Sequence, residues 1–199
     1  MSWLSEQVLE AELVQLRPLL EADKPALVAA AADGRLWELW YTQVPSVDTV
    51  DAYVDFALSE QAAGRALPFA VVERASGEVI GTTRLCNAEP ANRRLELGYT
   101  WYASRVQRSA INTQCKLLLL GHAFEQLSAV AVELRTHWHN RASRTAIARL
   151  GAKQDGVLRN HRVDPDGALR DTVVFSILDS EWPTVRKSLQ FKLARRAAD

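Results

Sequence analysis

The stretch from Glu96 to Thr113, ELGYTWYASRVQRSAINT, joins a strand-like run to the start of a helix through a short loop. The loop carries Arg105 and Arg108, and the small residues Ser109 and Ala110 follow them. A helix N-terminus binds phosphate well because its first N–H groups are free and the helix dipole is positive there. The stretch therefore indicates an anion site, and a plain strand-to-helix connection with solvated arginines fits the same residues.

This stretch resembles motif A of the GCN5-related N-acetyltransferase (GNAT) family, Gln/Arg-x-x-Gly-x-Gly/Ala. Gln107 matches the first position, whereas Ala110 stands where Gly is usual and Asn112 where Gly or Ala is usual. The Cβ atoms at both positions restrict close backbone approach to a phosphate. The resemblance implies that backbone amides hold the pyrophosphate of acetyl-CoA, here those of Arg108, Ser109, Ala110, Ile111, Asn112 and Thr113 beside Gln107.

A second stretch, HNRASRTAIARLGA from residues 139 to 152, resembles the family pattern Asn-x-x-Ala-x-x-x-Tyr-x-x-x-Gly-Phe. Asn140 and Gly151 match in spacing. Ser143 stands at the Ala position, which is typical of the RimJ/RimL-like branch, and Ile147 stands at the position of the Tyr that is the family's common general acid. The resemblance implies that Ser143 contacts the sulfur of CoA and passes it a proton, directly or by relay from water. A serine hydroxyl near a helix start also bonds the backbone, and this alternative stays open.

The tail from Gly156 to Trp182, GVLRNHRVDPDGALRDTVVFSILDSEW, resembles the closing hairpin of the same branch. Together the three stretches extend the resemblance over residues 13–185. We expect one GNAT domain over residues 1–199 with its core in that range. The resemblance implies a mixed α+β fold with a twisted, mostly antiparallel sheet of about seven strands flanked by helices.

Hydrophobic periodicity gives the same order of elements, because period-2 and period-3.6 runs follow one another along the chain. Helices interrupt the strands without alternating strictly with them, which indicates a mixed sheet. We expect strands at 13–19, 67–74, 78–85, 94–103, 130–138, 153–163 and 169–178, and helices after Asp23, at 46–63, 109–127 and 141–150, and from Glu181.

Glu96 is the candidate base that deprotonates an acceptor amine. Strand alternation places it on one face with Gly98, Thr100 and Tyr102. A carboxylate in a mainly apolar strand has a raised pKa, which suits a general base. The alternative is an ion pair with Arg94 or Arg135.

Other residues are candidates for binding the donor. The resemblance implies that the strand bearing Trp101 and Tyr102 separates from its neighbour, so that its backbone pairs with pantetheine. Asn140 contacts pantetheine or caps the helix, or does both. Arg144 is the candidate for a CoA phosphate, with Arg141 as the alternative.

The acceptor side is open to two interpretations. Trp37, Trp40 and Tyr41 are candidates to line a pocket, although aromatic residues there also suit helix packing. Arg159 and His161, with Arg162, favour a substrate carboxylate. Residues 1–90 carry 14 acidic and 6 basic side chains, which favours a cationic acceptor, and the basic half from residue 91 suits phosphates.

The composition argues against several classes of protein. Cys86 and Cys115 are too few for a disulfide framework, and Cys115 has no paired base that would make it a nucleophile. His137 and His139 lack a third ligand at metal-binding spacing, so we expect no metal. No run is apolar enough for a membrane helix, the N-terminus lacks a signal pattern, and there is no interleaved aromatic RNA signature. We expect a cytoplasmic protein that binds neither membrane nor nucleic acid, with a homodimer through the C-terminal strands as one possibility.

The sequence thus predicts an acetyl-CoA-dependent N-acetyltransferase in which a primary amine attacks directly in a ternary complex. The acceptor is a protein N-terminus or a small amine. The alternatives are a non-catalytic acyl-CoA-binding or regulatory domain with the same fold, and a scaffold or dimerisation module.

Overall fold

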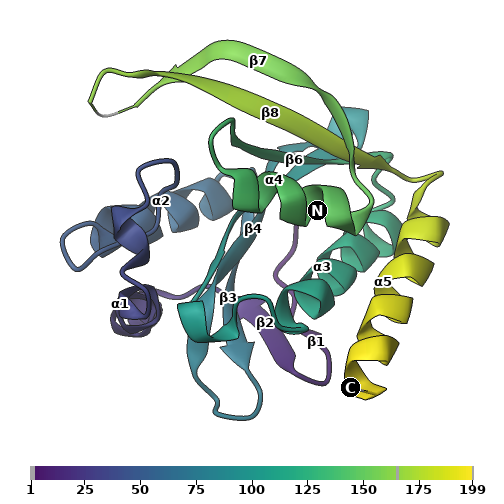
Figure 1. Ribbon diagram of the computed structural model, residues 1–199, viewed down its shortest axis with the longest axis horizontal. Helices are drawn as coiled ribbons and strands as arrows, with labels where there is room; N and C mark the ends of the chain where they lie inside the picture. Colours follow the sequence, from purple (N-terminus) through teal and green to yellow (C-terminus); the bar gives the residue numbers. More distant parts are fainter. Residues whose placement is uncertain (1–2, 165, 199) are drawn as a thin grey trace.

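One sheet of eight strands runs through the computed structural model, which describes residues 3–164 and 166–198 (Figure 1). The strand order is β1-β2-β3-β4-β5-β6-β8-β7, and every neighbouring pair is antiparallel except β5 and β6. The predicted mixed, mostly antiparallel sheet is confirmed. The strand that the sequence did not predict is β1, which has two residues, Leu9–Glu10.

The other strands and the helices follow the predicted order. The strands are β2 (Val14–Pro18), β3 (Leu67–Glu73), β4 (Val79–Glu89), β5 (Arg94–Tyr102), β6 (Ala131–His137), β7 (Lys153–Val163) and β8 (Leu169–Leu178). The helices are α1 (Lys24–Ala32), α2 (Val50–Ala62), α3 (Ile111–Gly121), α4 (Arg141–Leu150) and α5 (Trp182–Ala198).

Two predicted helices are shorter than the sequence indicates. The helix predicted from Ser46 begins at Val50, because the Ser46 carbonyl and the Thr49 hydroxyl close a hydrogen-bonded turn before it. The helix predicted to reach Leu127 is α-helical to Gly121 and continues as a π-helical segment, His122–Gln126. Neither difference moves the residues predicted to bind ligands.

Two consecutive threonines of β4 show which helices cover which face of the sheet. The Thr82 hydroxyl bonds the Tyr53 hydroxyl of α2 at 2.9 Å. The Thr83 hydroxyl bonds Thr100 Oγ1 at 2.7 Å, and Lys116 of α3 donates to Thr100 at 2.8 Å. Neighbouring side chains of a strand point to opposite faces, so α2, with α1 packed against it, and α3 lie on opposite sides of the sheet (Figure 1). Helix α5 contacts both α3 and α4.

One extra residue in β5 changes the faces that its side chains meet. Arg84 pairs with Gly98 and Thr82 pairs with Trp101, so Thr83 alone faces two residues of β5. This is a β-bulge, and the inserted residue Tyr99 has a φ of 50°.

The bulge corrects a prediction from strand alternation. Glu96 and Gly98 share the α2 side of the sheet, as expected. Thr100, bonded to Lys116, and Tyr102, whose hydroxyl lies beside Cys115, are on the α3 side instead. The prediction that all four share a face was wrong because the extra residue inverts the alternation after Gly98.

Strand β4 approaches β5 very closely just after the bulge. A Cβ atom at Gly81 would lie 2.1 Å from the Trp101 carbonyl oxygen, which is a backbone atom that cannot yield cheaply. Glycine at this position therefore allows the two strands to pair again beyond the inserted residue.

Strands β5 and β6 pair only at their beginnings. Their parallel pairing runs from Arg94 with Ala131 to Glu96 with Glu133 and then stops. Farther on, within the described chain, β5 pairs with β4 and β6 with β8. The edge of β5 from residue 97 to 102 thus turns N–H and C=O groups away from β4 without a neighbouring strand.

Candidate active site

The open edge of β5 leads directly to the loop before α3. The side chains of Trp101 and Tyr102 are buried, and Trp101 Nε1 donates to the Tyr53 hydroxyl at 3.2 Å. Gln107 folds back onto the strand, since its Nε2 donates to the Tyr102 carbonyl at 2.9 Å. Gln107 therefore fixes the loop against the edge of the strand.

The N-terminus of α3 presents free backbone amides. The Ser109 hydroxyl donates to the Val106 carbonyl at 2.6 Å and accepts from the Ile111 amide at 3.2 Å. The Ile111 amide is thus already occupied by a bond inside the loop. Among the described residues, no hydrogen-bond partner is found for the amides of Arg108, Ser109, Ala110, Asn112 and Thr113. Free amides at a helix N-terminus suit an anion. Apart from the Ile111 amide, those predicted to hold the pyrophosphate are thus unoccupied, and pyrophosphate binding stays a prediction.

The arginines near this cradle differ in their availability. Arg105 is held by Glu73 and Glu78, at 2.8 Å each, so it connects the loop to the β3–β4 hairpin. Arg108 is exposed, has a φ of 61° and forms no ion pair with a described residue. Of the two arginines in the loop, Arg108 is the one left to meet a phosphate.

Arg141 and Arg144 lie together on α4. Both line a hollow of about 440 Å³ beside that helix. The Arg144 guanidinium lies 4.2 Å from the centre of the Trp138 ring and donates to the Trp138 carbonyl. The phosphate contact expected of Arg144 or Arg141 stays a prediction.

Asn140 is the N-cap of α4. Its Oδ1 accepts from the Ser143 amide at 2.9 Å, which confirms the helix-cap interpretation. The Ser143 side chain is partly buried, and its hydroxyl makes no hydrogen bond with another described residue. The alternative in which that hydroxyl bonds the backbone is therefore not found. Ile147 is buried. Because isoleucine is apolar, this position of α4 offers no ionisable group.

Glu96 is largely buried, with its side chain 12% exposed. Asn87 Nδ2 donates to Glu96 Oε2 at 2.7 Å, and Arg135 Nε lies 3.7 Å from the same oxygen. The alternative ion pair with Arg94 is absent, because Arg94 binds Glu133 at 2.7 Å. Arg135 also binds Glu133 at 2.7 Å, so its contact with Glu96 is the weaker one.

The electrostatic setting of Glu96 suits a general base. Burial raises the pKa of Glu96 above its ordinary value, while Asn87 and Arg135 oppose the rise. A Cβ atom at Gly98 would come within 2.8 Å of Glu96 Oε1, so the glycine leaves space beside that oxygen. A carboxylate with a raised pKa accepts a proton from an amine more readily than an ordinary one does.

The aromatic residues expected on the acceptor side separate into two groups. Trp37 packs against the hydrophobic core. Trp40 is 65% exposed, and its ring centre lies 5.1 Å from that of His137 and 5.6 Å from that of Tyr41. The structure therefore brings Trp40 and Tyr41 to the end of β6, and Trp37 serves helix packing.

Arg159 and His161 of the β7–β8 hairpin do not lie together. Arg159 binds Asp171 at 2.6 Å, while His161 Nδ1 lies 3.0 Å from Thr172 Oγ1. Asp171 and Thr172 are consecutive in β8 and point to opposite faces. The pairing of β7 with β8 shifts between Leu158 and Arg162, which the alternation of residue types did not reveal. Substrate binding by Arg159 and His161 stays a prediction.

Sequence reasoning missed several residues around Glu96. Asn87 holds the carboxylate, Tyr99 forms the bulge, and Arg84 is buried nearby on β4. From a single sequence, nothing distinguishes an asparagine or arginine that lies beside a candidate base from any other such residue in a strand. The bulge carries none either, because it is defined by the pairing of two strands.

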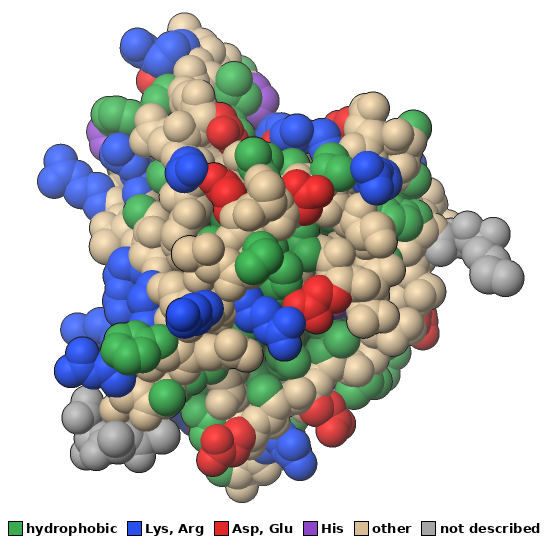
Figure 2. Space-filling view, turned by 90° about the vertical axis from the view of Figure 1, so that its right-hand side faces the viewer, with side chains coloured by type: hydrophobic (Ala, Val, Ile, Leu, Met, Phe, Trp, Pro, Cys, Tyr) green, Lys and Arg blue, Asp and Glu red, His purple; other side chains and the backbone are tan. Residues whose placement is uncertain are grey.

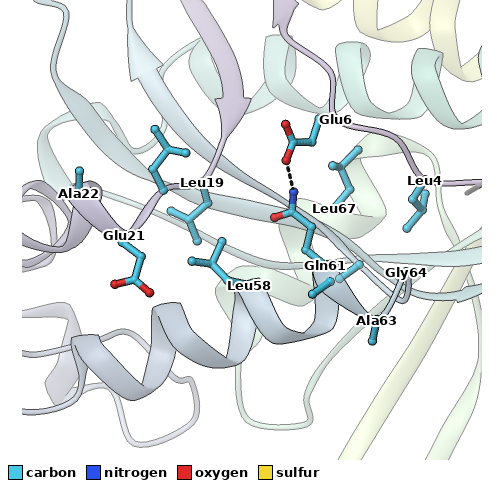
Figure 3. A pocket seen from close by; sticks show the side chains of 13 residues that line it. Leu4, Glu6, Leu19, Glu21, Ala22, Leu58, Gln61, Ala63, Gly64 and Leu67 are labelled. Atoms are coloured by element: carbon cyan, nitrogen blue, oxygen red, sulfur yellow. Dashed lines mark hydrogen bonds between the residues drawn. The ribbon is translucent and has the colours of Figure 1, made fainter.

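A cavity of about 880 Å³ lies elsewhere, between the N-terminal segment, β2 and the end of α2 (Figure 3). Leu19, Leu58 and Leu67 line it, and Gln61 donates to Glu6 across it at 2.8 Å. None of the predicted site residues lines this cavity. It is separate from the candidate active site.

The chain matches the model of one protein family. Residues 14–153 match the family described as the acetyltransferase (GNAT) domain. The chain belongs to the GNAT family. That range includes the first two of the three sequence stretches, and the resemblance to this family is thereby confirmed.

Individual relatives agree with this assignment. The chain is 31% identical over 106 residues to "Putative ribosomal N-acetyltransferase YdaF" of Bacillus subtilis (strain 168). That match covers 53% of the chain and 57% of YdaF, so the chain spans little more than half of this curated relative.

Solved structures match over nearly the whole chain. A GCN5-related N-acetyltransferase from Brucella melitensis is 31% identical with a TM-score of 0.84, covering 95% of this chain and 86% of that one. Mycobacterium smegmatis RimJ, in a complex with CoA-disulfide, is 26% identical with a TM-score of 0.76, covering 94% and 93%. The RimJ/RimL-like resemblance is therefore confirmed.

Surface charge, helix hydropathy and the placement of possible metal ligands further characterise this GNAT protein. Lys and Arg side chains gather along one edge of the face that carries α5, while Asp and Glu side chains are scattered over it (Figure 2). Across residues 3–164 and 166–198, no helix is both long and apolar enough to span a bilayer. In the same residues, no three His, Cys, Asp or Glu side chains are grouped so as to hold a metal ion.

Lys116 of α3 is buried on the far side of the bulge. Its ammonium donates to Thr100 Oγ1, and no carboxylate of the described chain pairs with it. Burial lowers the pKa of Lys116 to about 8, against the weaker opposing effects of Cys115 and Cys86. The native state thus holds a charge that water would solvate better.

Replacing this buried charge should stabilise the fold near neutral pH. In the unfolded chain the pKa of Lys116 is about 10.4, so between pH 8 and 10 the unfolded chain keeps a proton that the native state has lost. Stability of the wild type should therefore rise through that window. At pH 7, Lys116→Met should raise the free energy of unfolding by on the order of 2–3 kcal/mol, and the gain should shrink toward pH 10.5.

Urea unfolding at pH 7 and at pH 10.5 measures this difference. Lys187→Met, at an exposed position of α5, is the matched control and should change stability by less than about 0.5 kcal/mol. A Lys116→Met protein that is less stable than the wild type at pH 7 would contradict the argument.

Proposed function

We propose that this protein transfers an acetyl group from acetyl-CoA to a primary amine, either the N-terminus of a protein or a small amine. The observation that carries the proposal is the open edge of β5, which runs from Glu96 to the free amides before α3. One end of this edge suits an amine and the other suits a phosphate. A thioester donor with a long amide-bearing arm spans such an edge.

The residues at the edge fit the donor. Pantetheine is an amide-rich arm, and the backbone of Trp101 and Tyr102 offers it N–H and C=O groups in the way a strand would. The amides of Arg108, Ser109 and Ala110 face the pyrophosphate, with the Arg108 guanidinium beside them. The Tyr102 carbonyl has a second lone pair in addition to the one that Gln107 occupies.

Glu96 prepares the acceptor. An ammonium group cannot attack a carbonyl, so it must first lose a proton. The Oε1 oxygen of Glu96, beside Gly98, takes that proton directly or through one water molecule. The freed amine then forms a bond to the carbonyl carbon of the donor while the C–S bond breaks, and the nitrogen releases its second proton to water as the amide forms.

Ser143 is the candidate partner of the leaving thiolate. Its amide is fixed by Asn140, which sets the position of the side chain, while its hydroxyl has no partner of its own. The hydroxyl can donate to the sulfur and regain a proton from water. Ile147 is apolar and buried, so the position one turn beyond Ser143 supplies no proton for this role.

Calorimetry with acetyl-CoA and a thiol-release assay test the proposed function together. We expect binding at micromolar to high-micromolar concentration and thiol release with at least one amine from a panel of small amines and short peptides. Binding without release would favour a non-catalytic acyl-CoA-binding domain. Absence of binding would show that Ala110, Asn112 and the occupied Ile111 amide have abolished the cradle.

Replacing the base should slow turnover and remove its pH dependence. In the wild type, kcat/KM should rise with pH as Glu96 loses its proton, above the ordinary carboxyl range because its pKa is raised. Glu96→Gln should lower kcat by about 10²- to 10⁴-fold and remove that rise. The control is Glu89→Gln, at an exposed position of β4, which should keep both properties. An unchanged profile in Glu96→Gln would exclude Glu96 as the base.

The serine should matter for turnover and little for donor affinity. We expect Ser143→Ala to lower kcat by roughly 10- to 100-fold, because the leaving thiolate loses a hydrogen-bond donor. The dissociation constant for acetyl-CoA should stay within about twofold, since the cap uses the Ser143 backbone. Thr145→Ala, exposed on the same helix, is the control. Equal kcat values for both variants would exclude the role of Ser143.

A further inference from the structure

Arg84 is a buried cation on β4 that lacks an ion-pair partner within the described chain. Its residue surface is 2% exposed, and it has the largest fully buried side chain of the described core. Its Nη1 is sealed from solvent and has no hydrogen-bond partner. No ion pair to Arg84 is found among the described residues. An arginine that loses its water without gaining a partner is costly, so its retention calls for an explanation.

Aromatic rings account for part of the surroundings of Arg84. The centre of its guanidinium lies 4.0 Å from the centre of the Tyr99 ring, 5.6 Å from that of Phe56 and 5.7 Å from that of Tyr53. Such rings attract a cation through their π faces. They do not accept the N–H groups that lie in the plane of the guanidinium, so its hydrogen-bonding capacity remains unused.

Arg84 and Glu96 are diagonal neighbours on one face of the sheet. Arg84 pairs with Gly98, and Glu96 pairs with Cys86, two residues along β4. Diagonal neighbours are about 7–8 Å apart. These opposite charges nevertheless form no ion pair, because Glu96 is held by Asn87 and Arg135. Glu96 and the unsatisfied cation Arg84 thus share one face of the sheet without an ion pair between them, and a small group with both an amine and an oxygen has a partner in each.

The cover over Arg84 consists of side chains that reach the surface. Phe56 is 48% exposed, and Tyr99 is partly exposed. Tyr99 is also the inserted residue of the bulge. It lies beyond the part of β5 that pairs with β6. The proposed contact therefore requires these two side chains to rotate away from the guanidinium.

We propose that Arg84 selects the acceptor by binding an oxygen on the carbon next to the one that bears the amine. This inference rests on the proposed function. It adds a second contact to the acceptor, beside the contact of the amine with Glu96. The chemistry is that of an α-amino acyl group, whose amine goes to Glu96 and whose carbonyl or carboxylate oxygen goes to Arg84. The peptide carbonyl of a protein N-terminus and the carboxylate of a free amino acid both supply this oxygen. Alkylamines and lysine side chains lack it.

Three acceptors with the same amine-bearing carbon test the proposal. They are a tetrapeptide that begins with alanine, free alanine, and isopropylamine, which lacks the oxygen. The quantity measured is the ratio of kcat/KM for each oxygen-bearing acceptor to that for isopropylamine. Comparing this ratio between wild type and Arg84→Met cancels the differing basicity of the amines. We expect the ratio to fall at least tenfold in Arg84→Met, with the value for isopropylamine unchanged within twofold.

The two arms of the test distinguish the source of the oxygen. A loss confined to the tetrapeptide identifies a peptide carbonyl, and a loss confined to alanine identifies a carboxylate. Arg84→Lys keeps the charge without the planar fork and should recover part of the preference. Arg149→Met, at an exposed position of α4, is the control and should keep the wild-type ratio.

Several results would overturn the proposal. An equal loss with all three acceptors would make Arg84 a purely structural support of Tyr99. An unchanged ratio in Arg84→Met would exclude the contact, and the same measurement on Arg84→Lys decides the matter if Arg84→Met does not fold.

Failure of the proposed function would look different. It would appear as absent thiol release with every amine of the wider panel. Calorimetric binding of the tetrapeptide and of isopropylamine to the CoA-loaded wild type then still tests Arg84, because equal affinity for both contradicts the proposal.

Discussion

The insertion of one residue into β5 opposite Thr83 is the constraint on which the arrangement of the site depends. Before it, Glu96 and Gly98 face α2; after it, Thr100 and Tyr102 face α3. The same distortion occurs where β5 has already lost its pairing with β6. A strand that is both bulged and open on one edge can present side chains to one ligand and backbone groups to another. Under the proposed function, this combination lets one strand meet an amine and a thioester at once.

The cost of this arrangement is visible as two buried cations on opposite faces of the sheet. Lys116 supports the bulge from the α3 side through Thr100, and Arg84 lies against Tyr99 on the α2 side. Neither has a carboxylate partner among the described residues, so neither recovers its desolvation energy by ion pairing. The carboxylate on the same face, Glu96, forms no ion pair with Arg84 either. Keeping these charges apart costs stability, and under the proposed function it leaves Glu96 able to act as the base.

Local patterns in the sequence predicted the elements well, since alternation and helical spacing are properties of a single segment. The loop before α3 and the cap at Asn140 were predicted for the same reason. Features that depend on how two segments pair or pack were not predicted. The bulge at Tyr99 and the shift that separates Arg159 from His161 are both defined by strand pairing, and alternation gives the wrong face beyond each. Arg84 is buried because α2 packs over it. The residues next to Arg84 in the sequence do not reveal where α2 packs.

The two halves of the site are built from different kinds of groups, and this follows from where each lies. On the donor side the candidate contacts are mostly backbone amides and carbonyls, at the N-terminus of α3 and along β5, so side-chain changes such as Asn112 are tolerated if the backbone can still approach the ligand. On the acceptor side they are side chains on bulged or shifted strands, where one substitution changes charge or shape directly. Ile147 fits this division, because an apolar residue there means that the proposed function assigns proton transfer to Ser143 and Glu96 and donor binding to the backbone. Donor recognition therefore survives sequence divergence more readily than acceptor recognition, which explains why the sequence revealed the fold and the donor more clearly than the acceptor.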